Sequence, residues 1–372
     1  MYPDMGIFTN SDNSSSLIQL ITPGLVIMAV MIGGGYATGR ELVEFFLVHG
    51  PATGVASMAF TGLIIAATTM VGFELARRFE AYDYQRFCRI CIGPLWVVFE
   101  VGYLALLLLV LSVVSSAAGA LLTQLAGSPE FLNSVLFMAT VAFVVFYGND
   151  FLERVITAWS VIFYVSYGGL LIAVLYRFGD ALGPAFSHQP IDLATAWWSA
   201  VAYAGLNVVL IPILIFVARN FRSRREALLA GAIAAPLIII PGCALLITLS
   251  AFHPGIIDER IPVAAILDQL QMPVLSLLIP LVILGALVKS GAGMLHGLNE
   301  RIAGVFHHQS KPMPHWVRPA VALFAMTIAV YAASWFGLID LIKYGYRFSS
   351  YFFIVVIFIP LMTRGLWLIC RR

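Results

Sequence analysis

The sequence predicts an all-α polytopic membrane protein with ten transmembrane helices, and three observations support this. The chain of 372 residues is 61% hydrophobic and 11% charged, whereas soluble domains carry about 25% charged residues. Apolar stretches long enough to cross a bilayer, about 20 residues each, recur along the whole chain. Lysines and arginines gather in alternate loops, as the positive-inside rule requires of a multi-pass protein.

The apolar stretches number ten, and the last two are the least sharply separated. They are residues 17–48, 53–76, 95–125, 131–147, 155–176, 193–218, 227–252, 273–305, 317–336 and 347–369. Between the ninth and the tenth, residues 337–346 fit either a short helix or a loop. The first sixteen residues contain no lysine or arginine, so they lack the basic start of a secretory signal and we expect them to be retained.

The basic residues orient the predicted spans. Fifteen of the 21 lysines and arginines fall in loops that the alternation places on the cytoplasmic side when the N-terminus is inside. Five fall on the outer side, namely Arg40, Arg177, Arg260, Lys343 and Arg347, and Lys289 falls within a span. This asymmetry predicts a protein of the cell (inner or plasma) membrane with both termini in the cytoplasm.

The first span contains a glycine cluster that disfavours a continuous helix. Three consecutive glycines, Gly33 to Gly35, are followed by Gly39 in the middle of the apolar run, and each costs about 1 kcal/mol relative to alanine in a helix interior. Irregular backbone at membrane depth is tolerated where it is buried in protein or lines a polar cavity. The cluster therefore predicts either a solute site on broken backbone or close helix packing through small residues.

The sixth span repeats this peculiarity. Gly205 and Asn207, followed by Pro212, predict a second break. Because five spans separate the two breaks, the two halves have opposite topology, and we expect one transmembrane domain made of inverted repeats at residues 17–177 and 193–370. Paired interruptions in inverted halves indicate a transporter site at the bilayer midplane, which favours the binding interpretation of the glycines.

A family resemblance supports the same architecture. The run Ile32-Gly33-Gly34-Gly35-Tyr36 is similar to the first-helix signature of the amino acid–polyamine–organocation superfamily. The longer run from Gly33 to Glu41, with Phe45-Phe46, Gly50 and the later Asn299-Glu300-Arg301-Ile302, resembles the YkvI-like amino acid permeases. The resemblance implies a LeuT-type fold with a five-plus-five inverted repeat and discontinuous helices 1 and 6. It leaves the substrate open.

The breaks suggest how a solute would be held. A half-helix beginning near Ala37 would direct its N-terminal amides at a substrate carboxylate, with Gly34 and Gly35 allowing close approach. Freed carbonyls near Met31, Ile32 and Tyr203 would meet an amine. The substrate-binding residues that we expect are Gly33, Gly34, Gly35, Tyr36, Tyr203, Gly205 and Asn207. Small and aromatic residues of this kind fit a neutral amino acid or amine of moderate size.

Two groups near the outer side are candidates for gating. Arg40 and Glu44 lie four residues apart and are expected to pair with each other. This leaves Glu41 as the unpaired acid and a candidate for gating or proton exchange. Trp198, with Trp197, would form an aromatic lid over the site or belong to the interfacial belt, which we favour for at least one of the two.

Lys289 in the eighth span is a candidate for ion coupling, because a charge near the bilayer centre costs at least about 2.5 kcal/mol. In sodium-coupled relatives of the fold that this chain resembles, the eighth helix supplies hydroxyls to an ion, and Ser290 remains here. We hypothesise that the Lys289 ammonium replaces the ion and exchanges a proton through His296, since residues 289, 293, 296 and 300 share a helix face. The alternative is a structural lysine paired with an acid from another span.

The sequence thus favours a secondary active transporter working by alternating access, coupled to H⁺ or Na⁺. A non-transporting sensor of the same fold is the alternative. We expect no enzyme activity, because the loops lack a cluster of nucleophile, base and acid and a glycine-rich phosphate motif. The pair Cys88 and Cys91 and the loop histidines are not expected to bind metal. The expected partners are a small solute and the lipid bilayer, with no cofactor or nucleic acid, and the oligomeric state is not predicted.

Overall fold

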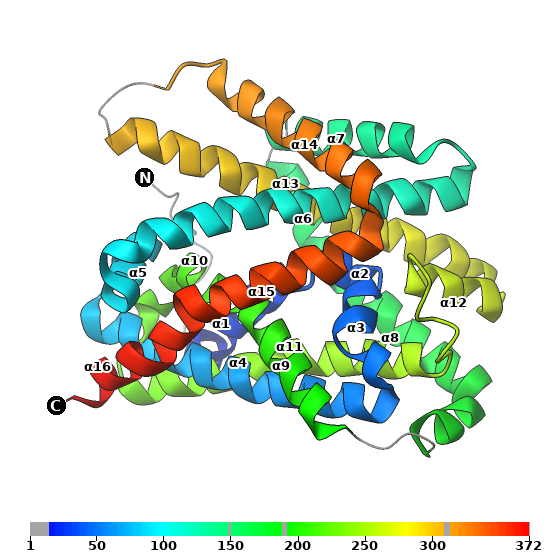
Figure 1. Ribbon diagram of the computed structural model, residues 1–372, viewed down its shortest axis with the longest axis horizontal. Helices are drawn as coiled ribbons and strands as arrows, with labels where there is room; N and C mark the ends of the chain where they lie inside the picture. The colour runs from blue at the N-terminus through cyan, green and yellow to red at the C-terminus, as the bar shows by residue number, and fades with distance from the viewer. Residues whose placement is uncertain (1–14, 148–149, 188–191, 309–312, 372) are drawn as a thin grey trace.

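The computed structural model describes residues 15–147, 150–187, 192–308 and 313–371, and within these ranges the chain is helical and contains no strand (Figure 1). The all-α class predicted from composition is therefore confirmed. The α-helices up to the sixth span are α1 (Ser15–Met31), α2 (Gly34–Ala37), α3 (Arg40–Phe45), α4 (Pro51–Phe79), α5 (Tyr84–Ile92), α6 (Trp96–Ala126), α7 (Glu130–Tyr147), α8 (Asp150–Ser187), α9 (Leu193–Asn207) and α10 (Leu210–Ile213). Those that follow are α11 (Arg224–Ser250), α12 (Pro262–Leu270), α13 (Pro273–His308), α14 (Val317–Asp340), α15 (Arg347–Phe353) and α16 (Leu366–Cys370).

Tighter and wider helical turns connect these elements. The 3₁₀ turns are η1 (Leu47–His49), η2 (Gly93–Leu95) and η3 (Ile215–Asn220), and the π-helical turns are η4 (Leu341–Tyr346), η5 (Ile354–Phe358) and η6 (Leu361–Gly365). π-Helical turns frequently occur at functional sites. The first of them, η4, contributes to the site described below.

Eight helices in the described part of the chain are long and apolar enough to cross a membrane. One of them, Val317–Cys370, counts as a single helix of 54 residues. At 1.5 Å per residue it is about 80 Å long, more than twice the hydrocarbon thickness of about 30 Å. It bends at Gly337, whose φ of 70° lies in the left-handed region that favours glycine. The segment after Gly337 is thus helical, and the count of ten spans stays a prediction.

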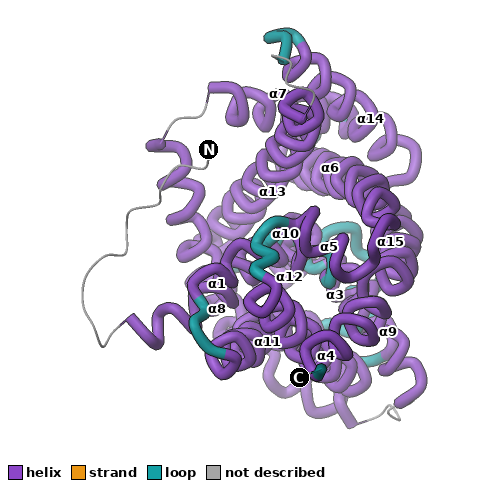
Figure 2. The backbone as a smooth tube through the Cα atoms, turned by 90° about the vertical axis from the view of Figure 1, so that its left-hand side faces the viewer, coloured by secondary structure: helices purple, strands orange, loops and turns teal. Residues whose placement is uncertain are grey.

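The long helices form two groups, which Figure 2 shows nearly end-on. In one group α11 packs against α1, α4 and α8, and in the other α6 packs against α7, α13 and α14. Small residues allow close approach within the first group, since a Cβ on Gly231 of α11 would lie 2.6 Å from the backbone nitrogen of Met70 on α4. The first span links the two groups, because α1 contacts α11 while α2 contacts α6 and α13.

Candidate functional site

The first span is interrupted twice, as the glycine cluster predicts. Helix α1 ends at Met31, and Gly33 adopts an extended conformation (φ −99°, ψ −165°) before α2 begins at Gly34. A second interruption falls at Gly39, whose φ of 79° is left-handed and favours glycine, and α3 begins at Arg40. The predicted half-helix starting near Ala37 is therefore wrong in detail. Ala37 ends the short α2, and the outer half-helix begins three residues later.

The first interruption leaves backbone carbonyls without a backbone amide partner. The amide of Gly33 donates to the carbonyl of Met31 at 2.8 Å instead of continuing the helical ladder to Ala29. Among the described residues, no backbone amide donates to the carbonyls of Ala29, Val30 or Ile32. Unpaired carbonyls at membrane depth are costly unless another polar group meets them. This part of the chain can therefore serve as a binding surface for a cation or a hydrogen-bond donor.

The three consecutive glycines face different neighbours. A Cβ on Gly33 would lie 3.1 Å from Oγ of Ser290, which places this hydroxyl beside the interruption. A Cβ on Gly34 would lie 2.2 Å from Leu287 Cδ2, so Gly34 permits close packing of α2 on α13. A Cβ on Gly35 would lie 3.2 Å from Oε2 of Glu41. Gly34 thus fits the packing interpretation of the cluster, whereas Gly33 and Gly35 lie beside polar side chains and fit the binding interpretation.

The sixth span is interrupted, as predicted, but not at Gly205. Gly205 lies inside the continuous helix α9, where a Cβ would meet Ile354 at 2.4 Å and the Ser350 carbonyl at 2.9 Å, so it is a packing residue and not a break. The helix is interrupted after Asn207, at residues 208–209 and again at Leu214. The amide Nδ2 of Asn207 donates to the Tyr203 carbonyl at 2.8 Å. That carbonyl, which was expected to meet a substrate amine, already has a partner.

Tyr36 and Tyr203, from the first and sixth spans, lie within electrostatic range of each other and of Glu41. All three are buried, with exposed fractions of 2%, 1% and 7%. The hydroxyls of both tyrosines are buried and make no hydrogen bond of normal geometry to a described residue. The Tyr203 ring packs edge-on against Phe45 and Phe46, with ring centroids 5.2 and 5.0 Å apart, which fixes α9 against the outer half of the first span.

A charged network closes the side of this region that the charge pattern predicts to face outward, here called the outer side. As predicted, Arg40 pairs with Glu44, at 2.9 Å, and both are buried. Arg40 also donates to the carbonyls of Ile257 and Glu259, at 2.5 and 3.1 Å, in the loop before α12. Arg347, at the start of α15, lies 3.5 Å from the other oxygen of Glu44. Removing one member of a buried ion pair costs about 3–5 kcal/mol, so the network is a strong outer closure.

Trp198 lines an outer vestibule above this closure. The vestibule has a volume of about 250 Å³ and is also lined by Phe45, His49 and Arg347. Burial, assisted by the nearby Arg347 and opposed by Asp192, lowers the pKa of His49, which therefore favours its neutral form. Trp197 instead packs against Phe60. Trp198 is exposed at the vestibule, and whether it acts as a lid or belongs to the interfacial belt stays a prediction.

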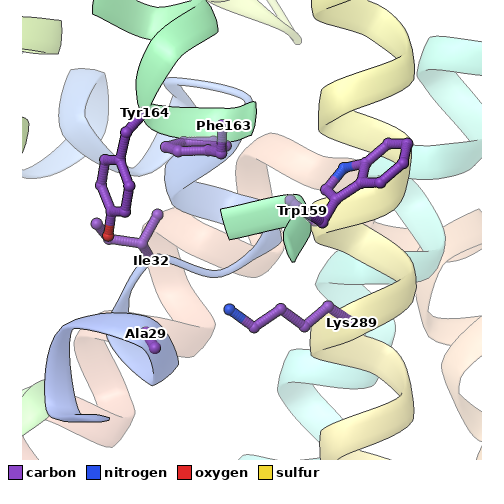
Figure 3. A pocket seen from close by; sticks show the side chains of 7 residues that line it. Ala29, Ile32, Trp159, Phe163, Tyr164 and Lys289 are labelled. Atoms are coloured by element: carbon purple, nitrogen blue, oxygen red, sulfur yellow. The ribbon is translucent and has the colours of Figure 1, made fainter. Parts of the chain in front are cut away.

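Lys289 lies on α13 at the opposite end of the interruption. With Ala29, Ile32, Trp159, Tyr164 and two further residues it lines a small pocket of about 20 Å³, enough for one water molecule. Figure 3 shows the lysine nitrogen directed at the end of α1, between Ala29 and Ile32. Trp159 donates to the carbonyl of Val282 at 3.1 Å, which holds α8 against α13. The predicted proximity of Lys289 to the first-helix break is observed.

The predicted relay below Lys289 follows a face of α13 that is open among the described residues. Gly293, His296 and Glu300 are all exposed, and a Cβ on Gly293 would contact nothing within 4 Å. Glu300 pairs with Arg318 of α14 at 2.9 Å. The spacing argument for one shared face agrees with the structure, and a role for His296 in proton transfer stays a prediction.

Three residues of the site were missed from the sequence. Tyr346 in η4 is buried and interacts electrostatically with Glu41, and Arg347 approaches Glu44. Tyr167 of α8 donates its hydroxyl hydrogen bond to the carbonyl of Ala37. No sequence signal could have found these contacts, because 130 or more residues separate the hydrogen-bonded partners.

Comparison with known proteins supports a membrane transporter fold. No family model matches the chain. The uncharacterized membrane protein YkvI of Bacillus subtilis is 27% identical over 301 residues, covering 77% of this chain and 82% of YkvI. The uncharacterized protein YyaD of the same organism is 22% identical over 348 residues, covering 91% of this chain and 96% of YyaD. The predicted resemblance to YkvI-like proteins is therefore confirmed.

Solved structures of a manganese transporter have a similar fold. A crystal structure of the Eremococcus coleocola manganese transporter superposes with a TM-score of 0.63 at 14% identity, covering 96% of this chain and 81% of that one. The same transporter in complex with an aromatic bis-isothiourea substituted compound gives a TM-score of 0.59 at 15% identity. At this identity the likeness shows the fold alone. The chain is a multi-pass membrane protein with the fold of a membrane transporter.

Proposed function

We propose that the protein is a secondary active transporter of a small amino acid or amine-type solute, which binds at the interrupted first span and the neighbouring sixth span. The observation that carries the proposal is the buried interruption between α1 and α2, where the carbonyls of Ala29, Val30 and Ile32 accept no backbone hydrogen bond among the described residues. Discontinuous helices at the midplane are the usual binding elements of such transporters.

The outer closure supports alternating access. Arg40, Glu44 and Arg347 join α3, the loop before α12 and α15 across the outer side of the interruption. Opening toward the outside requires these contacts to separate, and Trp198 would close over the vestibule again. On this proposal the N- and C-termini face the cytoplasm and the protein resides in the cell membrane, as the charge distribution predicts.

Lys289 supports coupling to protons in place of sodium. Its nitrogen is directed at the end of α1, between Ala29 and Ile32 (Figure 3), where a sodium ion would otherwise bind beside Ser290. A lysine that gains and loses a proton would bind and leave the backbone carbonyls there during the transport cycle. Proton release would follow the exposed face that carries His296.

A divalent cation is the other cargo to test, because the fold resembles a manganese transporter. Manganese is suited to a set of oxygen ligands from carboxylates, carbonyls and water. Within the described ranges, no group of three or more histidine, cysteine, aspartate or glutamate side chains lies together. The residues at the interruption therefore favour an organic solute over a metal ion.

The proposal is tested by accumulation in sealed proteoliposomes. Purified protein is reconstituted, a proton or a sodium gradient is imposed, and uptake of labelled amino acids, amines and Mn²⁺ is measured. We expect concentrative uptake of an amino acid or amine with the proton gradient alone. Binding without accumulation under either gradient would identify a sensor and overturn the transport proposal, and concentrative uptake of Mn²⁺ alone would identify a metal transporter.

A further inference from the structure

Glu41 is a buried acid for which the described part of the protein supplies no countercharge. It lies in the first turn of α3 and is 7% exposed. Its side chain folds back across the second interruption, since Oε2 lies 3.2 Å from the position of a Cβ on Gly35. Because Gly35 has no side chain, the carboxylate rests directly against the backbone of α2.

The neighbouring arginine is committed elsewhere. Arg40 donates to Glu44 and to the carbonyls of Ile257 and Glu259 on the outer side. In the described ranges, no arginine, lysine or histidine forms an ion pair with Glu41, and its carboxylate accepts no hydrogen bond. A buried carboxylate without a partner is strongly disfavoured. A cation or a proton must therefore accompany Glu41.

The surroundings of Glu41 are those of a site for an organic cation. Three buried tyrosines from three spans interact with it electrostatically, namely Tyr36 on α2, Tyr203 on α9 and Tyr346 on η4. The hydroxyl of Tyr36 has no hydrogen-bond partner among the described residues, and that of Tyr203 has the Asn207 side chain as its neighbouring polar group. Tyrosine rings attract ammonium groups through their faces, and unpaired hydroxyls accept N–H hydrogen bonds.

We propose that Glu41, with Tyr36, Tyr203 and Tyr346, binds the positively charged amine of the transported solute. This inference rests on the proposed function and narrows its substrate class to solutes that carry an ammonium group. The site lies directly inside the Arg40–Glu44 closure, where a solute entering from the outer vestibule first meets the interrupted span. The ammonium neutralises Glu41, and a carboxylate on the solute is not required.

The inference is tested by binding of a matched four-carbon series to the purified full-length protein. The probes are n-butylamine, 4-aminobutyrate, butyrate and butanol, each followed by thermal stability and by competition with the best-binding labelled amine. We expect stabilisation by the two probes that carry an amine and none by butyrate or butanol. Stabilisation by butyrate but not by butylamine, or by no amine up to its solubility limit, overturns the inference.

The Glu41→Gln variant tests the role of the charge. Removing one partner of a buried charge pair costs about 2–5 kcal/mol, so we expect amine affinity to fall about thirtyfold or more. Glu74→Gln is the control, because Glu74 is another buried acid and pairs with Arg77 near the C-terminal end of α4. Unchanged amine affinity in Glu41→Gln overturns the inference, even where proton-driven uptake is lost, since Glu41 is then a coupling group.

Failure of the inference and failure of the transport proposal give different results. Amine binding that depends on Glu41, without accumulation in proteoliposomes, supports the charge site and rejects transport. If the protein accumulates a solute and Glu41→Gln binds that solute with unchanged affinity, the charge site is rejected and the transport proposal stands. Tyr36→Phe is a second variant, which keeps the aromatic ring and removes the hydroxyl. We expect it to lower amine affinity only several-fold.

Discussion

Alanine substitutions at Gly34 and Gly35 separate packing from binding within one glycine cluster. A Cβ on Gly34 would lie 2.2 Å from Leu287 Cδ2, whereas ordinary contact begins near 3.4 Å, so the fully buried Leu287 must move by about 1.2 Å. Overpacking of this kind costs about 1–3 kcal/mol. We therefore expect Gly34→Ala to lower the apparent Tm by a few degrees.

Gly35→Ala is expected to behave in the opposite way. Its Cβ would meet Val113 at 3.7 Å, an ordinary contact, and Oε2 of Glu41 at 3.2 Å, which must retreat by a few tenths of an ångström. Alanine also favours helix by up to about 1 kcal/mol, so stability should change by less than about 1 kcal/mol. Because the carboxylate is displaced, amine affinity should fall several-fold.

The assay is apparent Tm with and without amine for the wild type and both variants. The reasoning predicts a lower Tm for Gly34→Ala, and a near-normal Tm with weaker amine stabilisation for Gly35→Ala. Equal loss of stability in the two variants would refute the contrast between packing and binding. So would full amine affinity in Gly35→Ala, which would show that the carboxylate position does not matter.

Three further predictions concern coupling, pH and topology. Lys289→Gln should keep solute binding but lose proton-driven accumulation, and wild-type uptake that needs sodium and ignores the proton gradient would contradict this role. Burial and Arg347 lower the pKa of His49, so the folded protein favours the neutral imidazole. The contribution of His49 to stability is therefore full above the ordinary histidine pKa, about 6.5, and declines as the pH falls below it. The apparent Tm should therefore fall on acidification to about pH 5 more in the wild type than in His49→Gln, and equal slopes would reject the effect. Single cysteines at Ala194 and Ser223 should label from opposite sides of the membrane, whereas labelling from the same side would reject the inverted topology.

The sequence was most informative where local chemistry alone decides the outcome. The glycines at 33 to 35 and 39 predicted an interrupted first span because glycine weakens a helix more than any other residue except proline. The spacing of Arg40 and Glu44 predicted their ion pair, since residues four apart share a helix face. The same pairing argument left Glu41 without a partner, as the structure confirms for the described residues.

The sequence was less informative where a residue acts through tertiary contacts. Gly205 resembles the glycines of the first span, yet it lies within a continuous helix, where Ser350 of α15 and Ile354 of η5 pack against it. Asn207 and the Tyr203 carbonyl were both predicted to contact the solute, but the Asn207 side chain donates a hydrogen bond to that carbonyl instead. Tyr346 lies in a π-helical turn that has no sequence signature, so its approach to Glu41 could not be predicted.

Alternating access at the interrupted spans is tested most directly by ligand-dependent accessibility on the two sides of the site. The four native cysteines, Cys88, Cys91, Cys243 and Cys370, are first replaced. Single cysteines are then placed at Ala202, which lines the outer vestibule, and at Gly293, on the exposed face of α13 below Lys289. Both are labelled in proteoliposomes with an impermeant thiol reagent. The account predicts that a bound amine changes the two labelling rates in opposite directions, whereas rates that change together, or stay constant while the amine binds, would contradict it.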